Sequence, residues 1–195
     1  MSTKTQWRNL TSKFLETTVN SIQVFDGELL NVWKDTVKLP DSNKSVREFI
    51  KHPGASVLLP IFKNGDVMLV GQYRYPLKDV FLEVPAGKLD PNESPEKTAL
   101  RELREEAGLS CENLHYLGPF HPCVGYSDEV IHLFVGWGVT EDGLNSDDDE
   151  FLTRHRVHFT EVEEMIESGD ITDAKTIITV LRARKWWDKN GPFGL

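Results

Sequence analysis

Glutamates at helical spacing give this sequence its clearest capacity for chemistry. Glu105 and Glu106 follow Glu102 by three and four positions, so the three carboxylates would be neighbours on a helix. Like charges at this spacing weaken a helix, and anions near its C-terminus oppose the helix dipole. A bound cation would offset both effects, and magnesium is usually held by a few carboxylates, waters and substrate phosphates. The pattern therefore predicts a divalent-cation site.

An ordinary surface helix with ion pairs is the alternative for the same residues. Arg101 and Glu105 have the spacing of an i,i+4 ion pair, which is a common arrangement on solvated helices. The flanking pattern favours the cation site. Its fixed identities extend from Gly87 through Glu93 to Gly108, and average residue usage makes such a set very improbable by chance.

The sequence also marks the ends of the helix that would carry these carboxylates. Ser94 can cap the free N–H groups, and Pro95 suits the first helical position, where no N–H is needed. Gly108 can adopt the left-handed conformation that follows a last turn. The helix is therefore expected to run from Pro95 to about Ala107. Its expected buried stripe consists of Ala99, Leu100, Leu103 and Ala107.

The complete stretch resembles the Nudix box, the motif of the Nudix hydrolase family. It has Gly87, five residues, Glu93 and seven residues before the run from Arg101 to Leu109, RELREEAGL, and it matches the box at every position. The resemblance implies an α/β fold, a Nudix α/β/α sandwich with a mixed sheet. It also implies metal-dependent hydrolysis of a nucleoside diphosphate linked to another group.

The resemblance further implies roles for individual residues. Glu102, Glu105 and Glu106 match the positions that bind Mg²⁺, for which Mn²⁺ is a possible substitute. The main-chain carbonyl of Ala86 would be a further ligand. Arg101 matches a position that orients a glutamate, which makes it a catalytic candidate.

Composition narrows the class of protein. The formal net charge of -9 argues against a surface for nucleic-acid backbones, and it makes a cation useful at a phosphate site. Two cysteines without a CxxC motif indicate free thiols in a reducing compartment. The first ten residues contain no apolar signal core, and no run of about 18 apolar residues occurs. We therefore expect a soluble, cytoplasmic protein that binds neither membranes nor nucleic acid.

Turn signals divide the chain into two expected parts. Residues 1–45 read as a small antiparallel β subdomain, with strands at 14–25 and 29–39 joined at Asp26-Gly27. It resembles a dimerisation element, so a homodimer is expected. Residues 46–195 read as the Nudix domain. Its expected strands cover residues 56–62, 66–74, 80–84, 113–120, 130–139 and 155–159. Two helices are expected after the last strand. The first is capped by Thr160 and Glu163 and ends at Gly169, and the second covers about 172–187 with Ile177, Val180 and Leu181 facing inward.

Several segments outside the box resemble the ADP-ribose pyrophosphatases and related nucleotide-sugar hydrolases. These segments are REFIKHPGA from Arg47, GQYR from Gly71, LEVPAG from Leu82 and PCVGYSDE from Pro122. The resemblance implies a nucleoside diphosphate sugar as substrate. It leaves two alternatives open, a GDP-mannose or broad nucleotide-sugar hydrolase and a non-catalytic nucleotide-binding sensor. The intact box disfavours the sensor.

Candidate substrate contacts and a catalytic base follow from the same resemblance. Arg74 suits a diphosphate, because guanidinium binds phosphate in a bidentate way and keeps its charge. Glu83 would meet a base or a sugar hydroxyl. The remaining candidates are Tyr126 and Glu129 in the sugar pocket, and Arg47 and Phe25 reaching the partner subunit's site. The expected base is Glu150, with Asp148, Asp149 or Glu105 as alternatives.

Overall fold

The computed structural model describes residues 10–143 and 151–195 of the chain. These residues form two compact units. Of the described residues, the first unit contains 10–52 and 123–129, and the second contains 53–122, 130–143 and 151–195. Each unit is described on its own below.

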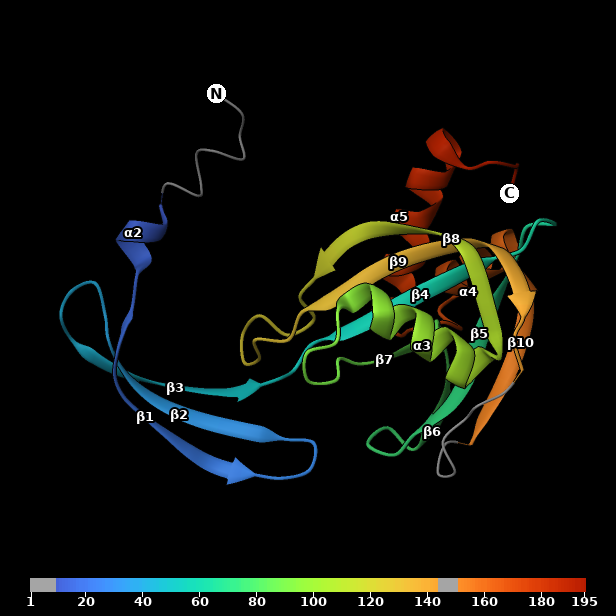
Figure 1. The fold of residues 1–195 in the computed structure, drawn as a ribbon. Helices are drawn as coiled ribbons and strands as arrows, with labels where there is room; N and C mark the ends of the chain where they lie inside the picture. Colours follow the sequence, from blue (N-terminus) through green and yellow to red (C-terminus); the bar gives the residue numbers. More distant parts are fainter. Residues whose placement is uncertain (1–9, 144–150) are drawn as a thin grey trace. The chain divides into compact units, whose positions relative to one another are not determined.

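The first unit is a three-stranded antiparallel sheet that follows a short helix, α2 (Thr11–Phe14) (Figure 1). Its strands, in sheet order, are β1 (Thr17–Asp26), β2 (Asn31–Lys38) and β3 (Lys44–Lys51). The turn expected at Asp26-Gly27 is present, and the Gly27 N–H donates to the Leu30 carbonyl at 2.9 Å. The sequence analysis did not assign β3.

A later segment of the chain completes the first unit. The N–H of Ile50 in β3 donates to the Tyr126 carbonyl at 2.8 Å, and the Asp128 N–H donates back to the Ile50 carbonyl at 3.2 Å. The His52 N–H also donates to the Asp128 carboxylate at 2.8 Å. The 123–129 loop is therefore attached to the β3 strand by main-chain hydrogen bonds.

The second unit is built around a mixed sheet, as the sequence analysis expected. Strands β10, β5, β4, β9 and β8 lie in that order, with β6 paired to β5 and β7 paired to β4. β4 and β9 run parallel, and the other pairs are antiparallel. The strands are β4 (Ala55–Ile61), β5 (Asp66–Arg74), β6 (Asp79–Glu83), β7 (Ala86–Lys88), β8 (Leu109–Phe120), β9 (Ile131–Glu141) and β10 (Leu152–His158).

Helices cover both faces of this sheet, because β4 is apolar on both sides. Val57, Leu59 and Ile61 pack with residues of α4 (Phe159–Ser168) and α5 (Ala174–Asn190). Leu58, on the opposite face, packs with residues of α3 (Pro95–Ala107). A strand that is buried on both faces reads as a continuous apolar run rather than an alternating one. The result is an α/β/α sandwich (Figure 1).

The box helix has the predicted ends. The Ser94 side chain accepts a hydrogen bond from the Lys97 N–H, and Gly108 has a φ of 69°, the left-handed conformation expected after the last turn. One part of the predicted buried stripe is wrong, since the Leu100 side chain is exposed.

The two later helices begin elsewhere than predicted. α4 is capped by His158 rather than Thr160, because the fully buried Phe159 already belongs to the helix. α5 is capped by Asp173, and Leu181 on it is exposed rather than inward. Across the described residues, no helix combines the length and apolar character needed to cross a membrane.

Candidate active site

Two box glutamates meet the short strand β7, which lies antiparallel to β4. A Cβ atom on Gly87 would lie 1.8 Å from Glu102 Oε1, so only glycine leaves room for that carboxylate. Glu106 Oε2 accepts a hydrogen bond of 2.9 Å from the Ala86 N–H. Glu106 is only 4% exposed, so its carboxylate is held inside the unit. The helix spacing and the glycine together bring Glu102 and Glu106 to the Ala86–Gly87 peptide.

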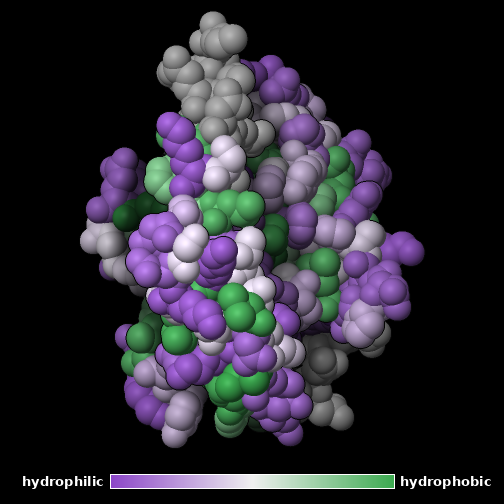
Figure 2. Space-filling model, turned by 90° about the vertical axis from the view of Figure 1, so that its left-hand side faces the viewer, coloured by the Kyte–Doolittle hydropathy of each residue, from purple (hydrophilic) through white to green (hydrophobic). Residues whose placement is uncertain are grey.

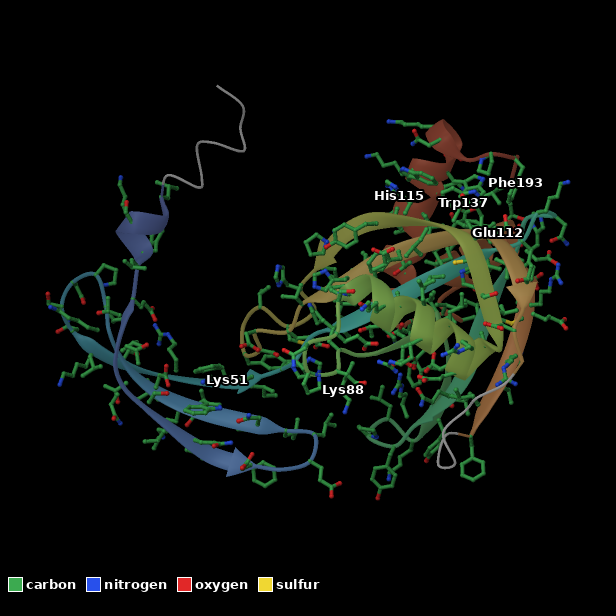
Figure 3. The ribbon with its side chains drawn as sticks, in the orientation of Figure 1. Lys51, Lys88, Glu112, His115, Trp137 and Phe193 are labelled. Atoms are coloured by element: carbon green, nitrogen blue, oxygen red, sulfur yellow. The ribbon has the colours of Figure 1, made fainter. Side chains whose placement is uncertain are left out.

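Arg101 lies at the centre of the box carboxylates. Its Nη1 donates to Glu102 Oε1 at 2.7 Å and to Glu105 Oε2 at 2.8 Å. Its Nε and Nη2 donate to the two oxygens of Glu93 at 3.2 and 3.0 Å. Nη2 also donates to the carbonyl of Lys88, a residue labelled in Figure 3, at 3.1 Å. One guanidinium therefore fixes the positions of three carboxylates, which is what an orienting role requires.

Electrostatics at Arg101 stabilise the charged forms of its partners. The hydrogen bonds from Arg101, with help from Thr98, lower the pKa of Glu93 to about 2. The hydrogen bond to Glu93 is in turn the main cause that raises the pKa of Arg101. Glu93 therefore remains ionised at any pH at which the protein would work.

The box offers the right donor chemistry for a hard divalent cation. Carboxylate and carbonyl oxygens are the ligands that magnesium prefers. Glu102, Glu105, Glu106 and the Ala86 main chain supply such oxygens from α3 and β7. Among the described residues, however, no three His, Cys, Asp or Glu side chains are arranged as a ready metal-binding group. In this structure Glu102 and Glu105 are instead bonded to Arg101.

A cavity of about 360 Å³ opens beside Arg74 and Glu83 on the same unit. Arg74 donates to the two Glu83 oxygens through Nε at 2.7 Å and Nη2 at 2.5 Å. Pro76, Leu77 and Phe81 form an apolar part of the lining. The remaining lining residues are Thr172, Asp173, Ala174 and Lys175, at the start of α5.

The sequence analysis missed Lys175, which also bonds to Glu83. The side chain of Glu83 is only 3% exposed. Burial acts to raise the pKa of Glu83, but the bonds from Arg74 and the charge of Lys175 outweigh it and keep the pKa below its usual range. No local signal could have linked Lys175 to Glu83, because the two residues are 92 positions apart.

The cavity and the box are electrostatically connected. The hydrogen bond to Glu83 is the main cause that raises the pKa of Arg74, and the charge of Glu106 acts in the same direction. The side chain of Arg74 is 41% exposed, so part of its guanidinium is accessible from the cavity. Arg74 therefore lines a space that could hold a substrate, and the charge of one box carboxylate, Glu106, acts on it.

Four predicted contacts belong to the first unit. Phe25 is exposed at the end of β1, and Tyr126 is exposed in the 123–129 loop. Arg47 donates from Nε to Glu16 Oε2 at 2.9 Å. Glu129 lies 3.6 Å from His52 Nδ1, measured from its Oε1. Their roles as substrate contacts stay predictions.

The predicted base lies outside the described residues. Glu150, with its alternatives Asp148 and Asp149, falls in the stretch from 144 to 150. Glu105, the remaining alternative, is described, and its Oε2 is bonded to Arg101. The choice of base therefore stays a prediction.

Comparison with known proteins places these features in a family. The NUDIX domain family model matches residues 51–179. The chain is 39% identical over 169 residues to the methanol dehydrogenase activator of Bacillus methanolicus, covering 86% of this chain and 91% of that protein. It is 36% identical over 167 residues to the ADP-ribose pyrophosphatase of Bacillus subtilis strain 168, covering 85% and 90%.

A solved structure has the same fold. The crystal structure of an ADP compounds hydrolase superposes with a TM-score of 0.79 at 21% identity, over 89% of this chain and 94% of that one. The family model and the long alignments agree with the box geometry and the mixed sheet. The chain therefore belongs to the Nudix family, as a pyrophosphohydrolase of the branch that its ADP-ribose pyrophosphatase relative represents.

Proposed function

We propose that this protein hydrolyses the pyrophosphate bond of ADP-ribose or a closely related nucleoside diphosphate sugar, in a reaction that depends on a divalent metal. The products would be a nucleoside monophosphate and a sugar phosphate. The observation that carries the proposal is that Arg74 lines a cavity on the same unit that carries the Glu102 and Glu106 carboxylates. The similarity to an ADP-ribose pyrophosphatase supports the choice of substrate.

The box residues would hold Mg²⁺, or Mn²⁺ in its place, through Glu102, Glu105, Glu106 and the Ala86 carbonyl. When bound, such an ion neutralises phosphate charge and lowers the pKa of a coordinated water. Arg101 keeps the carboxylates in place before and after binding. It shares Nη1 between Glu102 and Glu105 while Glu93 holds the rest of its guanidinium.

Arg74 would bind the diphosphate. A guanidinium has five N–H donors, and the two bonds to Glu83 leave three of them for phosphate oxygens. We propose Glu150 as the base that deprotonates the attacking water, with Asp148, Asp149 or Glu105 as the alternatives. Glu83 would also meet a sugar or base hydroxyl. Tyr126 and Glu129 would line the sugar pocket, and Arg47 and Phe25 would reach the partner subunit's site.

The N-terminal β subdomain, expected over residues 1–45, would join two copies of the chain, and residues 46–195 would form the catalytic domain. All ten residues of β1 are exposed within one chain. Figure 2 shows apolar surface in green among hydrophilic surface in purple. Exposed apolar side chains on a strand of this length are typical of a protein interface. A homodimer is therefore part of the proposal. We also propose that the protein acts in the cytoplasm.

The test is hydrolysis of a nucleotide panel with magnesium and with a chelator. The panel contains ADP-ribose, GDP-mannose, UDP-glucose, NADH, a dinucleoside polyphosphate and a nucleoside triphosphate. Fast turnover of ADP-ribose that requires magnesium is the expected result. Faster turnover of GDP-mannose would support the proposed metal chemistry but would make GDP-mannose, rather than ADP-ribose, the preferred substrate.

Glu106→Gln separates the metal proposal from a general loss of fold. The amide keeps the size of the side chain but removes the charge, so turnover should fall at least about 100-fold. Urea unfolding of the variant checks that the fold is intact. Near wild-type turnover in a folded Glu106→Gln variant would show that Glu106 is not a metal ligand.

A further inference from the structure

Four charged side chains form a connected group at the start of α5, and the Nudix box contains none of them. Arg74 and Lys175 both bond to the Glu83 carboxylate. Lys175 also lies 3.1 Å from Asp173 Oδ2. Two cations and two carboxylates therefore meet in the wall of the cavity, and their formal charges sum to zero.

The helix α5 holds this group at a fixed position. Asp173 caps the helix by accepting from the Thr176 N–H at 2.9 Å and from the Thr176 hydroxyl at 2.6 Å. The same hydroxyl accepts from the Val84 N–H at 2.9 Å, next to Glu83 in the chain. Thr176 is fully buried, so the start of α5 is joined to the segment that leads into the box.

Without Lys175, Glu83 would have Arg74 as its counterion and the cavity wall would carry an excess negative charge. The pair would also be less well fixed, because Lys175 holds Glu83 from the side of α5 while Arg74 holds it from β5. Both effects act against an anionic ligand, since a wall of net negative charge repels phosphate.

We propose that Lys175 is a positioning and charge-balancing residue for the substrate diphosphate. It neutralises the buried Glu83 carboxylate, so the guanidinium of Arg74 keeps a fixed direction and a net attraction for phosphate. This inference rests on the proposed function, because it takes a diphosphate to be the ligand of Arg74. Lys175 itself acts through Glu83 and Arg74 rather than on the reacting atoms.

The first experiment compares steady-state kinetics of Lys175→Met, Lys175→Arg and Lys189→Met with the wild type on ADP-ribose. Loss of a charged hydrogen bond should raise KM about 10- to 100-fold in Lys175→Met while kcat stays within about threefold, because ground-state and transition-state binding weaken together. Lys175→Arg should recover most of the affinity. Lys189→Met, an exposed lysine on the same helix, should leave both constants unchanged.

A purely structural role for Lys175 predicts a different result. In that case Lys175→Met would lower the urea midpoint and reduce kcat through loss of active enzyme, with KM unchanged. This result would overturn the proposal. A double variant adds an independent readout. Glu83→Gln removes the charge that Lys175 neutralises, so adding Lys175→Met to it should change KM much less than Lys175→Met does alone. Equal effects in both backgrounds would also overturn the proposal.

Binding of a methylene analogue of ADP-ribose, measured by calorimetry, separates this inference from the proposed function. If the wild type hydrolyses nothing in the panel, the proposed function fails, yet weaker analogue binding by Lys175→Met still supports the role of Lys175. If Lys175→Met binds the analogue as tightly as the wild type does, or if the wild type does not bind it, the role proposed for Lys175 is overturned.

Discussion

Gly87 and Glu102 depend on each other at the scale of single residues. The position that a Cβ on Gly87 would take is already filled by the end of the Glu102 side chain. Because that end is flexible, an added methyl group would displace the carboxylate rather than the backbone. The glycine of the box is thus explained by the space that a carboxylate needs against the main chain.

Gly87→Ala should therefore separate activity from stability. We expect turnover of ADP-ribose to fall at least about 100-fold, since a misplaced catalytic group is costly, while the free energy of unfolding changes by about 1 kcal/mol or less. Gly194→Ala, where the added Cβ meets open space, is the matched control and should change neither quantity. Large destabilisation with residual activity in proportion to the folded fraction would contradict this explanation.

Glu93 makes a pH-dependent contribution to stability. Its pKa is lowered from 4.5 to about 2 in the folded protein, chiefly by Arg101. A carboxyl with a depressed folded pKa stabilises the protein above its unfolded pKa, and this stabilisation is lost as the pH falls toward the folded value. The loss from this group is therefore expected between about pH 4.5 and pH 2.

Glu93→Gln tests this contribution through urea unfolding at pH 6, 4.5 and 3. The variant should be less stable than the wild type at pH 6, and the difference should narrow at pH 3, because Glu93 is mostly protonated in the unfolded chain there and folding must ionise it. A gap that is constant from pH 6 to pH 3 would show that the Glu93–Arg101 pair does not titrate in this range.

At the scale of elements, one hydroxyl joins α5 to the segment before the box. Thr176 Oγ1 accepts from the Val84 N–H and donates to Asp173. Thr176→Val keeps the shape but leaves a buried N–H without that acceptor, so we expect a loss of about 1–3 kcal/mol in unfolding free energy. KM for ADP-ribose should rise as well, since Asp173 and Lys175 lose their support.

Thr179→Val is the control for this prediction. Thr179 is equally buried, but its hydroxyl donates to the Lys175 carbonyl one turn earlier in the same helix. A valine there removes only a local bond and should cost less than about 1 kcal/mol. If the two variants were equally destabilised, the hydroxyl of Thr176 would have no special role in joining α5 to the box segment.

The elements also show what could be predicted from the sequence. The box helix and its ends were predicted because Ser94, Pro95 and Gly108 act through local geometry. β3 was not assigned, although its partner β2 was, since β3 is recognised as a strand only through its pairing with β2. The start of α4 was misplaced because burial of Phe159 outweighed the local capping signal at Thr160.

The candidate site also has parts that the sequence could predict and parts that it could not. The carboxylate-bearing helix follows from spacing within one element. The Arg74–Glu83 contact joins neighbouring strands β5 and β6, which pair from Val70 with Glu83 to Arg74 with Asp79. The contribution of Lys175 depends on where α5 packs, and packing of a distant helix has no signal in local sequence.

At the scale of the whole molecule, the exposed strand β1 should determine the oligomeric state. Val19 and Ile22 are 51% and 48% exposed within one chain. Replacing both with lysine places charge on the proposed interface, so sedimentation should report a change from a dimer to a monomer of 22.2 kDa. Leu181→Lys, an equally exposed position on α5, should leave the dimer intact. A wild type that sediments as a monomer would refute the interface.

The order of strands in the second sheet has a consequence for synthesis on the ribosome. β4 lies beside β9, with Ala55 opposite Ile131, and β5 lies beside β10, with Gln72 opposite Leu152. The β1–β2–β3 meander contains only pairs that are consecutive in the chain, so it can form early, whereas long-range pairing is slow. The box helix therefore leaves the ribosome well before two strands of its sheet. Until β8 and β9 follow, its apolar stripe lacks part of its cover. This is the interval in which the nascent chain is most exposed to misassembly and most in need of a chaperone.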